Sequence, residues 1–200
     1  MTRIERYSNP SIFFHWTIAI LIILNVILGL SAQYNLISMD MQRPVINFHK
    51  STGLLVLVLV ILRLGWRLMR TPPPLPATYK PWEVAASHVA HIALYVVALG
   101  LPLSGWAHDS AWSMAAQFPF HWYGTFSWPH IWFIENLSPD VKEAWHTRLG
   151  LWHTWFGYAL YALLVAHIGG ALKHQFIDKE SELQRMLPGP RPQGMPADEG

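Results

Sequence analysis

The chain has 200 residues, of which 52% are hydrophobic and only 13% are charged, whereas a soluble domain is about 25% charged. This composition predicts an integral membrane protein, and the net charge of +2 argues against a nucleic-acid partner. The lack of cysteine excludes disulfides, iron–sulfur clusters and covalently attached c-type haem, and no P-loop, dinucleotide fingerprint or Ser/His/Asp order is present.

Four long apolar segments follow one another along the chain, each near the length of a membrane-spanning helix. They cover residues 12–32, 45–68, 84–107 and 149–172. The first has too long an apolar run for a signal peptide and no convincing small-residue cleavage site, so we interpret it as a span. The pattern predicts an all-α integral membrane four-helix bundle within residues 1–178.

The connections between these segments differ in character. Residues 71–81 are rich in proline and predict a stiff, extended link. Residues 108–143 predict a long loop whose tryptophans suit a membrane interface. Residues 179–200 predict a polar cytoplasmic tail that ends in a disordered Pro/Gly-rich stretch.

The distribution of basic residues predicts the orientation. Ten of the 14 lysines and arginines lie on the side that holds both termini and the proline-rich link. The four on or near the other side are Arg43, Lys50, Lys142 and Arg148. Because loops rich in Lys and Arg stay in the cytoplasm, both termini are expected there and the lipid bilayer is an expected partner.

Two histidines on the fourth apolar segment carry most of the functional signal. His153 and His167 are fourteen residues apart. At about 100° and 1.5 Å per residue, they point within about 40° of the same direction and lie about 21 Å apart along the helix. Imidazole is the usual axial ligand of haem iron, so this spacing suggests two stacked haems.

Depth in the bilayer pairs these histidines with two others. His15 begins the first span on the cytoplasmic side and matches His167, whereas His49 begins the second span on the outer side and matches His153. Each pair is a candidate set of axial ligands for one b-type haem. A lone membrane histidine can simply bond a backbone carbonyl, but four at two matched depths favour function, since buried ionisable groups are costly.

The remaining histidines leave alternatives open. His88 and His91 share a face of the third span and are alternative ligands, although a second matching pair is missing. We favour a quinone or proton role for His91 and place His174 beside the same site, with simple packing as the alternative for His91. His108, His121 and His130 are expected in solvated loop or interface, and metal binding there is the less favoured reading.

Four basic residues are candidates for contacts with haem propionates or with anions. Arg63 and Arg67 lie near the inner pair, and Lys50 and Arg148 lie near the outer pair. For Arg67, an ordinary positive flank of a membrane span is an equally good interpretation.

At this point the sequence resembles the bacterial cytochrome b561 family of small di-haem membrane proteins. The resemblance runs from about residue 7 to 189 and rests on motifs that occur in order. These are FFHW (13–16), NFHKSTG (47–53), RLGWRL (63–68), HVAHIALY (88–95), LPLSGW (101–106), WHTWFGY (152–158) and the stretch 166–189. The loop of residues 108–143 is the least family-like part.

The resemblance implies the haem ligands, the electron acceptor and the location of the protein. It implies that His15, His49, His153 and His167 are the axial ligands of two b haems, that ubiquinone is a partner, and that the protein lies in the bacterial inner membrane. Members of the family resemble superoxide:ubiquinone oxidoreductases, in which superoxide gives an electron at the periplasmic face. If superoxide is the donor, Lys50, Arg148 and Arg43 would attract the anion.

Two other functions remain open from the sequence. The chain also resembles the cytochrome b subunit of a larger hydrogenase or formate dehydrogenase, where a partner's iron–sulfur cluster is the electron donor. A metal-ion transporter or sensor is a hypothesis of a different class, and the scarcity of Asp and Glu within the spans counts against it.

Overall fold

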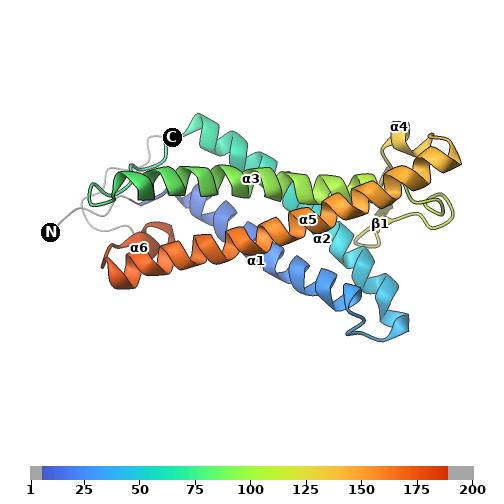
Figure 1. Cartoon of the computed structure of the whole chain (residues 1–200), viewed down its shortest axis with the longest axis horizontal. Helices are drawn as coiled ribbons and strands as arrows, with labels where there is room; N and C mark the ends of the chain where they lie inside the picture. Colours follow the sequence, from blue (N-terminus) through green and yellow to red (C-terminus); the bar gives the residue numbers. More distant parts are fainter. Residues whose placement is uncertain (1–5, 189–200) are drawn as a thin grey trace.

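Four long helices form the body of the molecule. The computed structural model describes residues 6–188. The four helices are α1 (Asn9–Gln33), α2 (Met39–Met69), α3 (Pro81–Ser110) and α5 (Pro139–Leu172), and Figure 1 shows them running roughly along one long axis. All four are long and apolar enough to cross a membrane, which confirms the predicted all-α membrane bundle.

Each expected span lies within one of these helices, and all four helices extend beyond it. The expected loop of residues 108–143 is therefore shorter, because α3 continues to Ser110 and α5 begins at Pro139. Proline suits the first turn of a helix, where no intrahelical partner for its missing N–H is needed. At the start of α3, Glu83 Oε2 also accepts a 2.9 Å bond from the Lys80 backbone N–H, which caps the helix.

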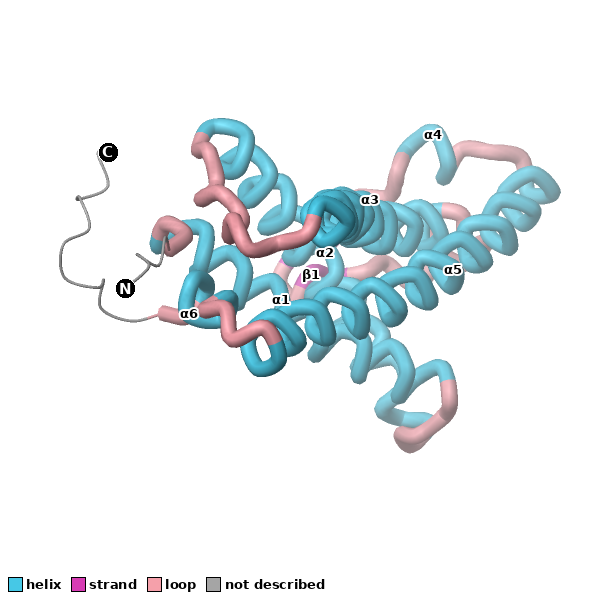
Figure 2. Tube along the Cα trace, turned by 60° about the vertical axis from the view of Figure 1, so that its left-hand side comes forward, coloured by secondary structure: helices cyan, strands magenta, loops and turns pink. Residues whose placement is uncertain are grey.

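One end of the bundle, here called the terminal end, holds the short elements near the chain termini. Helix α5 continues into the π-helix η1 (Lys173–Ile177), and α6 (Glu182–Met186) follows. Figure 2, which brings this end forward, shows α6 close to the start of α1. The Trp16 indole N–H donates a 2.6 Å bond to the Met186 carbonyl.

The first part of the expected polar tail is therefore packed against the bundle. Arg185 is only 5% exposed, and its guanidinium donates to the carbonyls of Pro73 and Pro74 in the proline-rich link. Its own carbonyl accepts a bond from the Tyr7 backbone N–H. The Pro/Gly-rich end of the expected tail, from residue 189 on, lies outside the described residues.

The opposite end, here called the loop end, is covered by the segment between α3 and α5. This segment contains β1 (His121–Trp122), β2 (Phe126–Ser127) and α4 (Trp132–Glu135). The two strands form an antiparallel hairpin, and it packs on α2: the Trp122 indole N–H donates to the Ser51 carbonyl at 3.2 Å. Phe120 is buried against Leu54 and Leu57 of α2.

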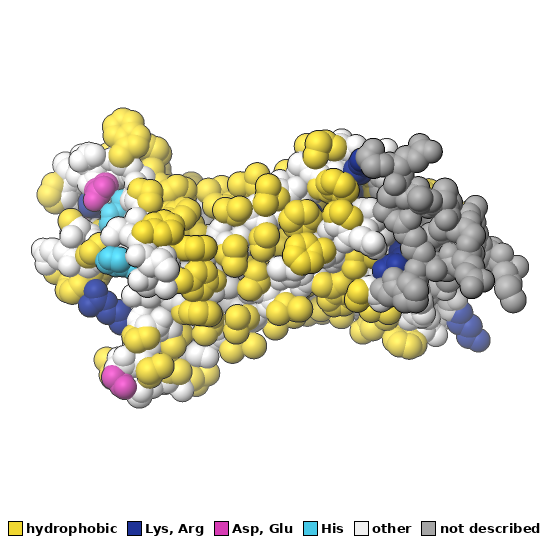
Figure 3. Space-filling view, turned by 180° about the vertical axis from the view of Figure 1, so that it is seen from behind, with side chains coloured by type: hydrophobic (Ala, Val, Ile, Leu, Met, Phe, Trp, Pro, Cys, Tyr) yellow, Lys and Arg dark blue, Asp and Glu magenta, His cyan; other side chains and the backbone are white. Residues whose placement is uncertain are grey.

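The surface of the bundle is largely apolar. Figure 3 shows hydrophobic side chains over the middle of the molecule and charged side chains near its ends. A second buried cluster, formed by Ile18, Val56 and Val60, holds α1 against α2. Exposed residues such as Ile20 (63%) and Val165 (74%) lie outside this core. Such a surface is stable in lipid, which the four candidate spans require.

Candidate functional site

A cavity opens between the helices in the half of the bundle nearer the loop end. Helices α1 and α2, α2 and α3, and α3 and α5 pack side by side, whereas α1 and α5 are not among the closely packed pairs. The resulting space has a volume of about 620 Å³ and is lined by all four long helices. Its wall is mostly apolar, as a slot for a flat hydrophobic cofactor requires.

His49 and His153 face each other across this cavity. Their ring centres are 6.2 Å apart and the ring planes meet at 79°. His49 Nδ1 donates to the Asn25 carbonyl at 2.9 Å, and His153 Nδ1 donates to the Leu101 carbonyl at 3.0 Å. These bonds fix the tautomer that leaves Nε2 as a free lone pair, which is the arrangement of metal-ligating histidines.

Two glycines make room for these rings. A Cβ atom at Gly29 would lie 2.9 Å from His49 Cε1, and one at Gly105 would lie 3.1 Å from His153 Cε1. Any larger residue would push the imidazoles out of position. The sequence therefore supplies both the histidines and the space that they need.

His15 and His167 form a second pair toward the terminal end. Their ring centres are 6.1 Å apart and their planes meet at 74°, which closely matches the first pair. His91 lies beside them, with its ring centre 5.5 Å from that of His167, and its Nδ1 is 3.4 Å from the Ser87 hydroxyl. The structure thus places His91 beside this second pair.

The spacing within both pairs fits one metal ion between two imidazoles. A histidine nitrogen binds a metal at about 2.0 Å. With roughly 1 Å more from nitrogen to ring centre on each side, two rings on opposite sides of one metal have centres about 6 Å apart. Asn25, which lines the cavity, also has a buried Oδ1 without a hydrogen-bond partner among the described residues, as expected where a bound group completes the site. The residues fit haem.

The four candidate anion contacts differ in their surroundings. Arg63 lies near His15 and His167, with its guanidinium 5.6 Å from the centre of the Tyr95 ring, and Arg67 is in the last turn of α2. Lys50 lines the cavity and forms a 2.5 Å ion pair with Asp109. Arg148 is exposed on α5 and is not among the residues that line the cavity.

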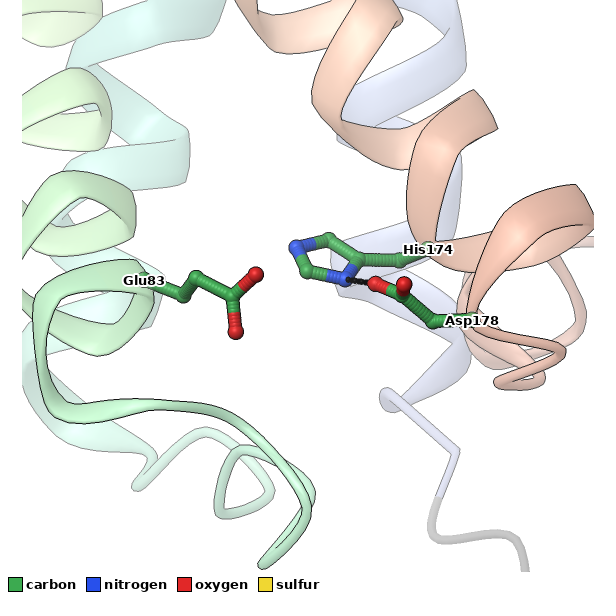
Figure 4. Close-up of side chains that lie close together, drawn as sticks. All are labelled: Glu83, His174 and Asp178. Atoms are coloured by element: carbon green, nitrogen blue, oxygen red, sulfur yellow. Dashed lines mark hydrogen bonds and ion pairs between the residues drawn. The ribbon is translucent and has the colours of Figure 1, made fainter.

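His174 belongs to an ion-pair cluster at the terminal end. Its Nδ1 is 2.7 Å from Asp178 Oδ2, and its ring stacks on Tyr79 at 4.1 Å. Figure 4 shows Glu83 of α3 facing the same imidazole from the other side. Burial raises the pKa of Tyr79, which therefore stays a neutral phenol.

Glu83, His174 and Asp178 have the composition of a metal site, but a lysine already supplies the positive charge. Lys173 Nζ is 2.5 Å from Glu83 and 2.7 Å from Asp178. The hydrogen bond from Lys173 holds the pKa of Asp178 below its usual value. The cluster is best described as a cross-link between α3 and the end of α5.

His108 and His146 are the cavity residues that the sequence interpretation missed. His108 was expected in solvated loop or interface, and the loop assignment is wrong, because His108 lies in α3 and lines the cavity together with His146 of α5. One signal was available: Trp-His-Thr-x-x-Gly occurs at 145–150 and again at 152–157. His146 is thus the counterpart of His153, seven residues nearer the loop end.

Comparison with known proteins agrees with this architecture. The family model described as prokaryotic cytochrome b561 matches residues 6–189. Cytochrome b561 homolog 2 of Escherichia coli (strain K12) is 32% identical over 184 residues, which is 92% of each chain. Cytochrome b561 homolog 1 of the same organism is 29% identical over 92% of this chain and 98% of the relative.

A third relative has a functional name. The probable superoxide oxidase CybB of Yersinia pestis is 26% identical over 94% of this chain and 98% of its own. Members of the matched family bind b-type haem and act in membrane electron transport. The family therefore favours electron transfer over the hypothesis of a metal-ion transporter or sensor. The chain belongs to the prokaryotic cytochrome b561 family.

Proposed function

We propose that the protein carries electrons across the bacterial inner membrane, between a periplasmic donor and ubiquinone, through two b-type haems. His49 and His153 would hold one haem near the loop end, and His15 and His167 would hold the other near the terminal end. The observation that carries this proposal is the matched spacing of the two pairs, 6.2 Å and 6.1 Å between ring centres. Haem supplies reversible one-electron chemistry at each position.

The basic residues support an orientation with the terminal end in the cytoplasm. Among the described residues, the proline-rich link and eight lysines and arginines are on that side, against four on the other, in agreement with the positive-inside rule. The loop end would then face the periplasm and receive the electron.

At the terminal end, His91 is the proposed quinone-binding residue. Its ring lies next to His167, so a quinone bound there would be close to the inner haem position. His174 bonds Asp178, and Lys173 joins Asp178 to Glu83. This chain of charged groups is suited to bring protons from the cytoplasm as quinone is reduced.

Superoxide is the proposed donor on the strength of the name of one relative. Among the proposed anion contacts, Lys50 is neutralised by Asp109, and the Arg43 guanidinium lies 4.6 Å from the centre of the Phe118 ring. A one-electron, outer-sphere reaction needs access to the haem edge more than a binding site. Arg63 and Arg67 near the inner pair, and Arg148 at the exposed surface, keep their proposed roles as propionate or anion contacts.

Stopped-flow spectroscopy on the purified haem-loaded protein tests this function. Superoxide should reduce the b-type spectrum within milliseconds to seconds, and added ubiquinone should reoxidise it. His91→Leu should slow the second step and leave the first unchanged. A spectrum that superoxide does not change would favour the alternative of an electron-transfer subunit with a protein donor, and a spectrum that ubiquinone does not change would refute the quinone role.

A further inference from the structure

His108 and His146 form a reciprocal clasp between α3 and α5. His108 Nδ1 donates to the His146 carbonyl at 2.9 Å, and His146 Nδ1 donates to the His108 carbonyl at 3.0 Å. The two rings stack with their centres 3.9 Å apart and their planes at 15°. Gly150 permits this approach, because a Cβ there would lie 3.0 Å from His108 Cε1.

The clasp fixes the proton on each ring. A carbonyl oxygen can only accept, so both Nδ1 atoms must carry hydrogen, and in the neutral ring Nε2 is then an acceptor. Neither Nε2 has a hydrogen-bond partner among residues 6–188. Because both residues line the cavity, its loop end offers two unpaired acceptor nitrogens beyond the proposed outer haem position.

The geometry of this clasp argues against a metal ion as the ligand. Imidazole lone pairs lie in the ring plane, so two nearly parallel rings cannot aim both lone pairs at one ion. The facing pair His49 and His153, at 6.2 Å and 79°, differs in this respect. Among the described residues that line the cavity, the carboxylate is that of Asp109, which is already paired with Lys50.

The surroundings argue against an anion. Among the described residues that line the cavity, Lys50 and Asp109 are the charged side chains apart from histidine, and they neutralise each other. A carboxylate or a bare anion offers only lone pairs, which two acceptor nitrogens cannot bind. The walls carry aromatic rings instead, among them Tyr34, Trp112 and Phe120.

We propose that this end of the cavity binds a dihydroxy-aromatic reductant, a small hydroquinone or catechol, as an electron donor in addition to superoxide. Its hydroxyl groups would donate to Nε2 of His108 and His146, and its ring would lie among the aromatic side chains. The proposal rests on the proposed electron-transfer function.

The electrons and protons released by this reductant are balanced by the reduction of ubiquinone at the terminal end. Each hydroxyl of the reductant loses one electron and one proton, so two electrons and two protons leave and the diol becomes the dicarbonyl. Nε2 of His108 or His146 takes each proton and passes it to water at the periplasmic face. The two electrons reach ubiquinone at the terminal end. There ubiquinone takes up two protons and becomes the quinol.

The test compares asparagine and glutamine at the same position. The amide of His146→Asn can replace Nδ1 in the clasp but offers nothing in place of Nε2, whereas His146→Gln places an acceptor near the Nε2 position. His121→Asn is the matched control, since His121 also bonds a carbonyl through Nδ1 but lies exposed in the hairpin, outside the cavity. Reduction by a water-soluble naphthohydroquinone is followed without oxygen and with superoxide dismutase present.

Binding is measured separately from turnover. Isothermal titration calorimetry with 1,3-dihydroxybenzene, which cannot form a quinone, reports the hydroxyl contacts, and its dimethyl ether is the ligand control. We expect the diol to bind wild type and the ether not to bind. Binding to His146→Asn should be about tenfold weaker, and hydroquinone oxidation about 100-fold slower, while His146→Gln keeps a large part of both.

Reduction by superoxide and the haem spectrum should be the same in wild type and His121→Asn, which lies outside the cavity. Binding of the diol is measured without turnover, so failure of this proposal is distinct from failure of the electron-transfer function. Equal hydroquinone kinetics in wild type, His146→Asn and His121→Asn would overturn the proposal. So would equal binding of the diol and its ether, or tight Zn²⁺ binding by wild type that His146→Asn abolishes.

Discussion

The close contact between Gly29 and the His49 ring predicts that Gly29→Ala, which adds one methyl group, weakens haem binding. In a helix interior, Gly→Ala normally stabilises by about 0.5–1 kcal/mol, because alanine restricts the unfolded chain and favours the helix. At Gly29 the added Cβ would lie 2.9 Å from His49 Cε1 and 3.2 Å from Nδ1. Contacts this short force the imidazole to move, and overpacking of this kind costs about 1–3 kcal/mol.

We therefore expect Gly29→Ala to weaken haem binding at the outer site by about 1 kcal/mol or more. This figure is the cost of overpacking less the gain in helix stability. Displacing the ring also breaks its bond to the Asn25 carbonyl, which holds Nε2 toward the cavity. The expected result is about fivefold to tenfold weaker haem retention at this position. The other haem site should keep its full occupancy.

Gly65→Ala is the control, because nothing lies within 4 Å of a Cβ at Gly65. Both variants are titrated with haem after detergent extraction, and the haem-to-protein ratio and the reduced-minus-oxidised spectrum are recorded. Gly65→Ala should match wild type or be slightly more stable. If Gly29→Ala binds haem as well as Gly65→Ala does, the proposed placement of the outer haem is wrong.

Three further changes test other parts of the account. Arg185→Met removes a buried cation that bonds the proline-rich link, and should destabilise the protein by about 1.5–3 kcal/mol and speed proteolysis after residue 178. Gly100→Ala places a Cβ 2.7 Å from Phe156 Cζ; thermal unfolding should show a lower Tm, with haem content unchanged. The hydrogen bond from Lys173 lowers the pKa of Asp178 in the folded protein. The ionised carboxylate therefore stabilises the folded protein above the ordinary pKa of 3.8, and this stabilisation is lost as pH falls through the lower folded value. On acidification over this range, the Tm of wild type should fall more than that of Asp178→Asn.

The sequence predicted the four long helices and the pairing of histidines from facing helices, because both follow from the periodicity of a helix. A spacing of fourteen residues repeats the direction of a side chain on a helix, so His153 and His167 indicate two sites on α5, and bilayer depth then selects His49 and His15 as their partners. The structure brings both pairs to the same separation. Their role as haem ligands stays a proposal.

The sequence interpretation failed where helices continue beyond the apolar segments. Hydropathy marks only the part of a helix that lies in hydrocarbon, so the end of α3 and the first five residues of α5 were taken for loop, and residues 144–148 were assigned to no element. His146 and His108 lie in these extensions. The position of Arg185 depends on contacts with residues more than 100 positions away, which no local pattern reveals.

Counting haem in ligand variants tests the central claim most directly. The pyridine haemochrome assay on purified wild type, His49→Leu, His15→Leu and the double variant gives the haem-to-protein ratio for each. We predict two b haems in wild type, one in each single variant with a distinct spectrum, and none in the double variant. One haem in wild type, or two in either single variant, would contradict the account.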